Sequence, residues 1–366
     1  MAFMPSEYGM IKKTFTVLLS SFLVLSLLVG CSSESVTENK NLASSPIGNA
    51  VLDSKTHDST KVKLAIEDLY YNPNKNYGSL WSSDLFNEKR FKLNIKLNKE
   101  EQKEAKLLAR SFESHMERGK VFMHYLLTEL KERNLPAELA AVPLVESGFK
   151  TRARSHANAH GPWQFTRQTG KSFGLSVTDQ YDEFYDFVAS TEASLTYLEH
   201  LYNALGKDWE LALVGYNQGE FGVKKLIRRA KAGGVKNINA QTVALSRTAR
   251  TYLKRFKAYA AIFQHPEAFG VEHPQVDNRV AFKRIPTKGR VNSMSEAAKL
   301  AGVDLKTLKH LNAGYLTDSL NSSKPHGLLV PMENALRFER AIGLKSIDPN
   351  NFDLATAHIE AYQVKL

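Results

Sequence analysis

The spacing of apolar residues predicts a largely helical middle region, from residue 98 to residue 270. Runs in which apolar residues recur every three or four positions predict helices at 188–205, 209–216, 223–229 and 247–263. A similar run covers 107–130, and Gly119 is predicted to divide it into two helices. This region has little of the alternating pattern that is typical of strands.

Two prolines shape the segment that ends at Glu146. Pro136 fits the first turn of a helix, because its missing N–H would have no partner there. Pro143 lies inside the same segment, and we expect it to bend the helix or to mark an irregular turn. Gly148 is the expected end of this helix.

After residue 270 the pattern changes from helical to mixed. Residues 280–285 alternate like a strand, and 328–331 predict a second strand. Between them, 293–301 and 305–311 predict two short helices joined at Gly302. The sequence therefore predicts a small β-α-α-β module at the C-terminal end.

The first 31 residues resemble a bacterial export signal. A lysine pair precedes an apolar stretch that ends in Leu28-Val29-Gly30-Cys31, a sequence similar to a lipobox. We predict that Cys31 becomes the lipidated first residue of the mature protein; the alternative is an ordinary signal peptide or an uncleaved anchor. Cys31 is the only cysteine, which excludes a disulfide framework and cysteine-based zinc sites. In such lipoproteins Ser32, in place of an aspartate, permits sorting to the outer membrane.

Composition divides the rest of the chain and limits its partners. We predict a flexible tether and an irregular segment at 32–75, because the first part is rich in Ser, Thr, Asn and Lys. The predicted domains are 76–270, with its core at 135–270, and 271–366. The formal net charge of +11 fits nucleic acid, a membrane surface or an acidic polymer as a partner.

Three polar clusters beside glycines and aromatic residues are candidates for chemistry. They occupy residues 145–149, 158–170 and 216–219. Glycines let a ligand approach the backbone closely, and the aromatic rings offer flat apolar surfaces for sugar rings. Glu146 follows an apolar run at a predicted helix C-terminus, and both features favour the protonated carboxyl. We therefore predict Glu146 as a general acid with a raised pKa.

The clusters resemble the ordered motifs of the lytic transglycosylases, most closely those of the membrane-bound type D. The resemblance covers about 135–270. The motifs are Glu146-Ser147, then Gly161-Pro162-Trp163-Gln164-Phe165 ending in Thr169-Gly170, then Tyr216-Asn217-Gln218-Gly219, and last Tyr252.

This resemblance implies a mainly α fold, with a lysozyme-like catalytic domain before the small α+β C-terminal module. It implies cleavage of the MurNAc-β-1,4-GlcNAc bond of peptidoglycan with formation of a 1,6-anhydro-MurNAc end. Glu146 would act as both acid and base, without a cofactor or a metal. The implied substrate-binding residues are Ser147, Gln164, Phe165, Tyr216, Asn217 and Tyr252.

Three positions depart from the family pattern, and two alternative functions stay open. Thr166-Arg167 replaces a common Met-Pro or Ile-Pro pair, Thr248 stands where a glutamate is frequent, and Phe221 interrupts a Gly-Glu-Gly run. The alternatives are a goose-type lysozyme-like hydrolase and a cell-wall-binding lipoprotein with weakened catalysis. Asp182 and Asp186 are interpreted as surface or helix-start charges rather than catalytic groups.

The C-terminal module resembles a LysM module, a type that binds the glycan chains of peptidoglycan. A DNA-binding helix-turn-helix is the competing interpretation, and the export signal argues against it. A helical cap that packs on the catalytic domain is a further alternative. The predicted partners are therefore glycan strands and, through the lipid on Cys31, a membrane, with no nucleic acid. The predicted location is the periplasmic side of the outer membrane, with the inner membrane as the second choice.

Overall fold

The computed structural model describes residues 70–321 and 327–344. All of them belong to one unit, Ser44–Leu366. The predictions for the signal segment, for lipidation at Cys31 and for most of the tether lie outside the described residues. Within the described ranges, no helix is long and apolar enough to cross a membrane.

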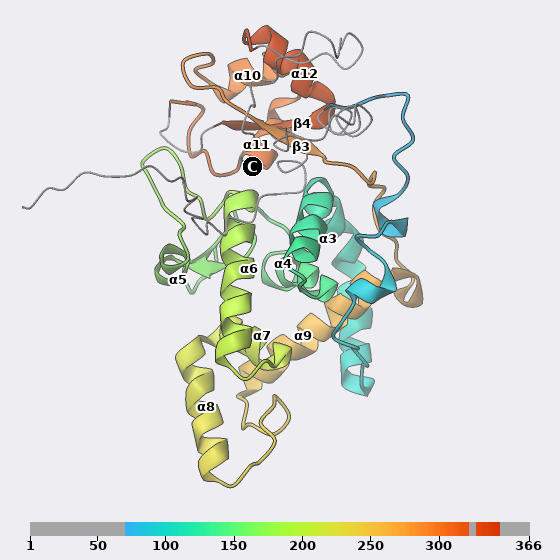
Figure 1. Cartoon of the computed structure of the whole chain (residues 1–366), viewed down its shortest axis with the longest axis vertical. Helices are drawn as coiled ribbons and strands as arrows, with labels where there is room; N and C mark the ends of the chain where they lie inside the picture. The colour runs from blue at the N-terminus through green and yellow to red at the C-terminus, as the bar shows by residue number, and fades with distance from the viewer. Residues whose placement is uncertain (1–69, 322–326, 345–366) are drawn as a thin grey trace, which may run out of the picture. The chain divides into compact units, whose positions relative to one another are not determined.

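Helices dominate the region between residues 99 and 270, as the apolar spacing predicts (Figure 1). The longer ones are α3 (Lys99–Glu132), α6 (Phe187–Ala204), α7 (Trp209–Gln218), α8 (Glu220–Ala232) and α9 (Arg247–Gln264). The shorter ones are η1 (Leu80–Ser82), η2 (Glu88–Arg90), η3 (Ala137–Ala141), α4 (Val142–Glu146), α5 (Arg167–Ser172) and η4 (Pro266–Phe269). The prediction of a mainly α fold is confirmed.

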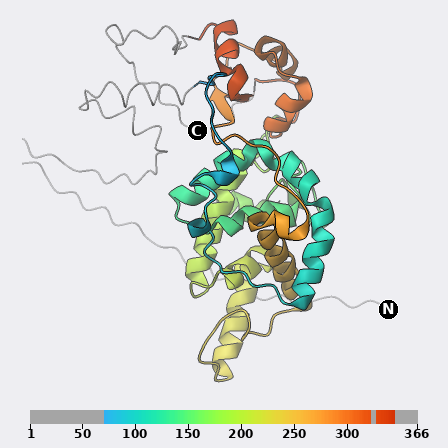
Figure 2. The same cartoon turned by 90° about the vertical axis from the view of Figure 1, so that its right-hand side faces the viewer.

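The core of this region forms where α3 packs along α9 and where α6 and α7 pack beside them (Figures 1 and 2). α3 begins with a capping box, in which Asn98 accepts from the backbone N–H of Glu101 and the Glu101 side chain accepts from that of Asn98. Further along, the Phe122 ring stacks on Phe187 of α6, with ring centres 4.1 Å apart. The apolar face of α3 is therefore the surface on which the shorter segments pack.

Gly119 does not divide α3, so the prediction of two helices was wrong. Glycine is required here for packing. A Cβ on Gly119 would lie 2.7 Å from Cγ of the Phe149 ring, which is fully buried. The missing side chain lets the residues after α4 approach α3 closely. Sequence spacing alone does not distinguish such a contact from a helix break.

The segment before Glu146 has the irregular turn expected from its prolines. Residues Ala137–Ala141 form a 3₁₀ helix, and α4 starts directly after it. Pro143 lies in the first turn of α4, where its missing N–H leaves no carbonyl without a partner. The Ser147 N–H donates to the Pro143 carbonyl (3.0 Å) and ends the helix. Glu146 is therefore the last residue of a very short helix.

The second motif forms a small β-hairpin that the apolar pattern does not predict. β1 (Ala159–His160) pairs antiparallel with β2 (Phe165–Thr166), and α5 follows at once. Gly161 begins the connecting turn with φ of 79°. A Cβ there would lie 1.7 Å from the Phe184 carbonyl oxygen, so only glycine fits between the hairpin and the residues before α6.

The C-terminal module has the predicted β-α-α-β order. β3 (Phe282–Ile285) pairs antiparallel with β4 (Leu328–Pro331), and α10 (Met294–Ala301) and α11 (Leu305–Leu311) lie between them in sequence. α12 (Met332–Ala341) follows β4 and packs against α10 and β3; its helical form was not predicted (Figures 1 and 2). The buried Asn312 side chain donates to the Leu329 carbonyl (2.7 Å) and accepts from its N–H (2.8 Å), which ties α11 to β4.

The module also contacts the helical region directly. The Asp182 N–H donates to the Gly314 carbonyl (2.9 Å), and Arg152 Nε donates to the Ala313 carbonyl (3.0 Å). The module therefore packs on the helical region. The boundary at residues 270 and 271 stays a prediction.

We predict that Gly119→Ala lowers the free energy of unfolding by about 1–2 kcal/mol. Overpacking against Phe149 costs about 1–3 kcal/mol, while replacing a helical glycine recovers up to about 1 kcal/mol. Urea denaturation measures the difference. Gly222→Ala is the matched control, because it lies in α8 with nothing within 4 Å of its added Cβ. We expect the control to be neutral or stabilising; equal effects of both substitutions would contradict the packing role of Gly119.

Candidate active site

Glu146 opens onto a cavity of about 400 Å³ between the end of α4 and one face of α9. The wall formed by α9 consists of residues spaced three or four positions apart on that helix, with their immediate neighbours. The cavity is lined by Val145, Glu146, Asn217, Arg247, Thr248, Thr251, Tyr252 and Arg255. The structure thus brings together the first, third and fourth predicted motifs.

The Glu146 carboxyl is half-buried, and its surroundings keep it partly protonated near neutral pH. Burial raises the pKa of Glu146 from its ordinary value of 4.5 to about 7. The Tyr252 hydroxyl donates to Glu146 Oε1 at 2.8 Å and opposes that rise, and so does the positive charge of Arg255. The predicted direction of the shift is confirmed, and its main cause is loss of water.

Two tyrosines stand beside the acid as neutral phenols. Burial raises the pKa of both Tyr216 and Tyr252 well above the ordinary value, so both keep their protons at neutral pH. The Tyr216 hydroxyl donates to the Trp163 carbonyl (2.8 Å) and lies 3.2 Å from the Ser194 hydroxyl. Tyr216 therefore connects α7 to the hairpin, whereas Tyr252 contacts the acid itself.

Three of the predicted substrate-binding residues make internal contacts in this structure. The Ser147 hydroxyl donates to the Pro162 carbonyl (2.8 Å), and Gln164 Nε2 donates to the Gly161 carbonyl (2.8 Å). Phe165 is 3% exposed and packs near the Tyr216 ring at 5.8 Å between centres. These residues shape the hairpin and hold it against α4.

Asn217 differs from those three because its side chain is exposed and lines the cavity. Phe221, one of the departures, is 86% exposed at the start of α8.

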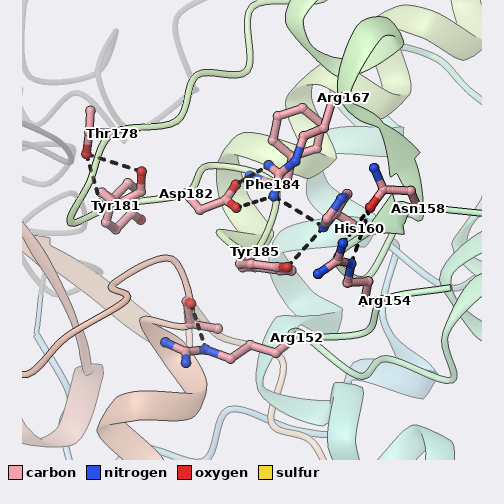
Figure 3. A network of polar contacts seen from close by, with 11 residues as sticks. Arg152, Arg154, Asn158, His160, Arg167, Thr178, Tyr181, Asp182, Phe184 and Tyr185 are labelled. Carbon is pink, nitrogen blue, oxygen red and sulfur yellow. Dashed lines mark hydrogen bonds and ion pairs between the residues drawn. The ribbon is translucent and has the colours of Figure 1, made fainter. Parts of the chain in front are cut away.

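The departure at Thr166-Arg167 has a structural role, and Figure 3 shows the contacts of Arg167. Thr166 caps α5 by accepting from the Thr169 N–H. Arg167 forms a two-point ion pair with Asp182 (2.8 and 2.6 Å) and lies over the Phe184 ring at 4.3 Å. A second contact joins Arg167 Nη2 to His160 Nδ1 at 3.2 Å. The departure therefore ties α5 and the hairpin to residues 182–184.

Asp182 and Asp186 are both buried, so the interpretation as surface charges was wrong, whereas the interpretation as a helix-start charge is confirmed for Asp186. Asp186 does start a helix: its carboxylate accepts from the N–H groups of Val188 and Ala189 at the beginning of α6. It also accepts from the Tyr181 hydroxyl (2.5 Å) and pairs with Arg284 of β3 (3.4 Å). Both carboxylates are structural ion-pair partners away from the Glu146 cavity.

The sequence did not single out Arg247, Thr251 or Arg255 as cavity residues. A signal was available, because Thr248, Thr251 and Arg255 share a helix face with Tyr252 at spacings of three and four. Thr248, where the family often has a glutamate, lies in the cavity wall.

Comparisons with known proteins agree with this arrangement. Residues 126–239 match the transglycosylase SLT domain family, and residues 281–343 match the LysM-like domain of lytic transglycosylase MltD. The first of these parts of the chain resembles a transglycosylase SLT domain. Its α4 acid, hairpin and α7 motifs all lie inside the matched range, and the predicted resemblance to a LysM module is confirmed as well. The matched residues are mainly α-helical.

Two relatives are similar over parts of the chain. It is 35% identical over 218 residues to membrane-bound lytic murein transglycosylase D of Escherichia coli K12, covering 60% of this chain and 48% of that protein. It is 39% identical over 114 residues to a putative tributyltin chloride resistance protein of Alteromonas sp. M-1, covering 31% of this chain and 55% of that protein. The chain spans about half the length of the curated relatives it matches.

Two solved structures align with less than half of the chain. An inactive mutant of lytic transglycosylase Slt from Pseudomonas aeruginosa is 21% identical with a TM-score of 0.31, covering 42% of this chain and 25% of that one. The 70 kDa soluble lytic transglycosylase of Escherichia coli is 20% identical with a TM-score of 0.32, covering 46% of this chain and 31% of that one.

The raised pKa of Glu146 predicts a pH-dependent cost to stability. Because the folded pKa of about 7 lies above the ordinary 4.5, folding favours the protonated form. The stability that this proton provides is complete at pH 4 and is lost as the pH rises through 7. Glu146→Gln removes the titration. Its stability relative to wild type should rise by up to about 3 kcal/mol between pH 4 and pH 8 in urea denaturation.

Glu192→Gln is the control for this measurement, because Glu192 is exposed and lies in α6, away from the cavity. We expect its stability relative to wild type to stay nearly constant over the same pH range. A constant difference for Glu146→Gln as well would contradict the protonated carboxyl.

Proposed function

We propose that this chain is a peptidoglycan lytic transglycosylase that cleaves the MurNAc-β-1,4-GlcNAc bond with Glu146 as its only acid and base. The observation that carries the proposal is a half-buried glutamate with a pKa of about 7, open to a cavity and held by one tyrosine. The SLT domain match and the names of the relatives support the same chemistry.

A pKa close to 7 suits both halves of the proposed reaction. The protonated Glu146 first gives its proton to the glycosidic oxygen, and the C1–O bond breaks with its electron pair on the leaving GlcNAc oxygen. The Glu146 carboxylate then takes the proton of the MurNAc C6 hydroxyl, whose oxygen forms the new bond to C1. The acid is restored, and no water is consumed. Attack within one sugar ring supplies the high effective concentration that an external water would lack.

The neighbouring side chains would orient the acid and the sugar. Tyr252 donates to one carboxyl oxygen of Glu146, which leaves the other oxygen as the site of the proton. The exposed Asn217 amide offers a donor and an acceptor to an acetamido group. Arg247 and Arg255 place positive charge in the cavity, where they would attract the carboxylates of MurNAc and its peptide.

The remaining predicted substrate-binding residues make contacts within the protein, which limits how they could bind a sugar. Ser147 and Gln164 would contact sugar only by exchanging hydrogen bonds that they now make to backbone carbonyls. Tyr216 donates to the Trp163 carbonyl of the hairpin, and the Phe165 ring lies beside the Tyr216 ring. We propose that they position the cleft rather than bind a sugar directly.

A hydrolase on the same fold is the second candidate. An inverting hydrolase needs a second carboxylate to activate water, at a distance that leaves room for that water. Among the described residues that line the cavity, Glu146 is the single carboxylate, which favours the transglycosylase. A wall-binding protein without catalysis is less well supported, because Arg167, the departure that raised this alternative, has a structural role.

The location follows the same proposal. We propose that the chain is anchored by a lipid on Cys31 at the periplasmic side of the outer membrane. Support comes from the lipobox-like sequence and from the name of a membrane-bound relative.

The test is mass analysis of muropeptides that the full chain, purified in detergent, releases from isolated sacculi. We expect products one water lighter than ordinary muropeptides, with 1,6-anhydro ends. Glu146→Gln should lower the rate by at least about 100-fold while sacculus binding is kept, since acid–base catalysis typically contributes 10²–10⁴-fold. Glu192→Gln should cleave at the wild-type rate.

The pH profile gives an independent check. Because the first step needs protonated Glu146, the rate should fall as the pH rises above about 7. Products of full mass with reducing ends would assign a hydrolase. Cleavage by Glu146→Gln at the wild-type rate would remove Glu146 from the mechanism.

A further inference from the structure

A second and larger cavity lies between the helical region and the C-terminal module. Its volume is about 800 Å³, which is in the range of small-ligand sites. One wall is Arg118 of α3 together with residues 149–153, which follow the Glu146 motif directly. The other wall is α11 with residues 312–318 of the module. Neither the SLT domain motifs nor the Glu146 cavity accounts for it.

The charge of this cavity is strongly positive. Its cationic lining residues are Arg118, Lys150, Arg152, Lys306 and Lys309, whereas Asp318 is the one carboxylate among the described lining residues. Lys309 lies 3.9 Å from Asp318, a loose and exposed pair. No ion pair with a described carboxylate is found for the other four.

The two arginines are fixed in place by the backbone. Arg118 Nε donates to the Gly148 carbonyl (2.9 Å), and Arg152 donates to carbonyls of the module, as Figure 3 shows in part. These bonds hold the guanidinium groups without cancelling their charge. Lys150 and Lys306, one from each wall, are exposed. The cavity therefore concentrates positive charge that an anionic ligand would neutralise.

The lining is apolar as well as cationic. Phe149, Met294, Tyr315 and Leu316 contribute to it, and Leu316 is 40% exposed. Such a mixture suits a ligand with several carboxylates on a chain that also carries methyl groups. A flat membrane surface would contact a protruding patch more readily than a concave one. The observations therefore favour an acidic peptide over a lipid surface.

We propose that this cavity binds the acidic stem peptide of peptidoglycan. The proposal rests on the proposed function, because an enzyme that cleaves peptidoglycan at Glu146 also holds the peptides of that polymer close to this cavity. Glu146 and Lys150 are four residues apart, so their Cα atoms are at most about 14 Å apart. A peptide carried by a glycan strand near Glu146 reaches the cavity at a high effective concentration. The site would favour strands that carry peptides over bare ones.

The test measures binding of the free tetrapeptide L-Ala-γ-D-Glu-meso-diaminopimelyl-D-Ala to the full chain in detergent by calorimetry. The test variant is Lys150→Ser with Lys306→Ser. The matched control is Lys89→Ser with Lys96→Ser, which removes the same charge from exposed lysines outside the cavity. We expect the test variant to bind at least tenfold more weakly and the control to bind like wild type. Added salt should weaken wild-type binding.

Several outcomes would overturn the proposal. Equal binding by the wild type and the test variant would show that the peptide binds elsewhere. No binding of the tetrapeptide to wild type would exclude the stem peptide as the ligand. If the test variant binds anionic phospholipid vesicles more weakly than wild type but binds the peptide equally well, these lysines contact a membrane instead.

A second readout separates this proposal from the proposed function. The test variant should cleave glycan strands stripped of peptides like wild type and should show a raised KM on peptide-bearing sacculi. Wild type that binds tetrapeptide but cleaves neither substrate would contradict the enzyme and leave the binding site in place. Equal KM values for wild type and the test variant on sacculi would contradict the role of the site in substrate choice.

Discussion

The position of the catalytic candidate depends on the clamp between α3 and the turn that follows Glu146. Three contacts form it within a few residues. Phe149 packs into the space left by Gly119, the Gly148 backbone lies against the His115 ring, and Arg118 Nε holds the Gly148 carbonyl. α4 is too short to be stable by itself, because a single turn does not repay the cost of nucleation. The clamp therefore holds the carboxyl where burial can raise its pKa.

Burial and hydrogen bonding act on Glu146 in opposite directions, and burial is the stronger. A fully solvated glutamate would be ionised at neutral pH and would have no proton to give. A carboxyl surrounded by strong donors would be a weaker acid catalyst for the same reason. One tyrosine bond orients the group, and the limited number of such bonds keeps its pKa near 7. The arrangement of α4 against α9 thus sets both the place and the proton affinity of the acid.

Much of the helical framework could be predicted, because α3, α6 and α9 each bury a continuous apolar stripe. The boundaries of α9 and α11 follow from such stripes almost to the residue. Gly119 was misread because a glycine that breaks a helix and one that admits a neighbouring ring look the same in sequence. The β1–β2 hairpin was missed because two-residue strands carry no period. The acid and its motifs were predicted, whereas Arg255 was not, because a cavity wall is a property of packing.

The role of Thr166-Arg167 also depends on packing, so it could not be predicted from the sequence. In sequence they interrupt a motif, which left weakened catalysis open as an alternative. In the structure Arg167 reaches Asp182, and the Asp182 N–H reaches Gly314 of the C-terminal module. The hairpin that carries Gln164 is therefore coupled to the module through one partly buried ion pair, in which Asp182 is the buried partner, and one backbone hydrogen bond. Breaking such a pair on one side leaves a buried charge without compensation, which is far more costly than losing an exposed pair. We therefore infer that the module stabilises the β1–β2 hairpin, because both contact the segment 178–186. This role is separate from any ligand that the module itself binds.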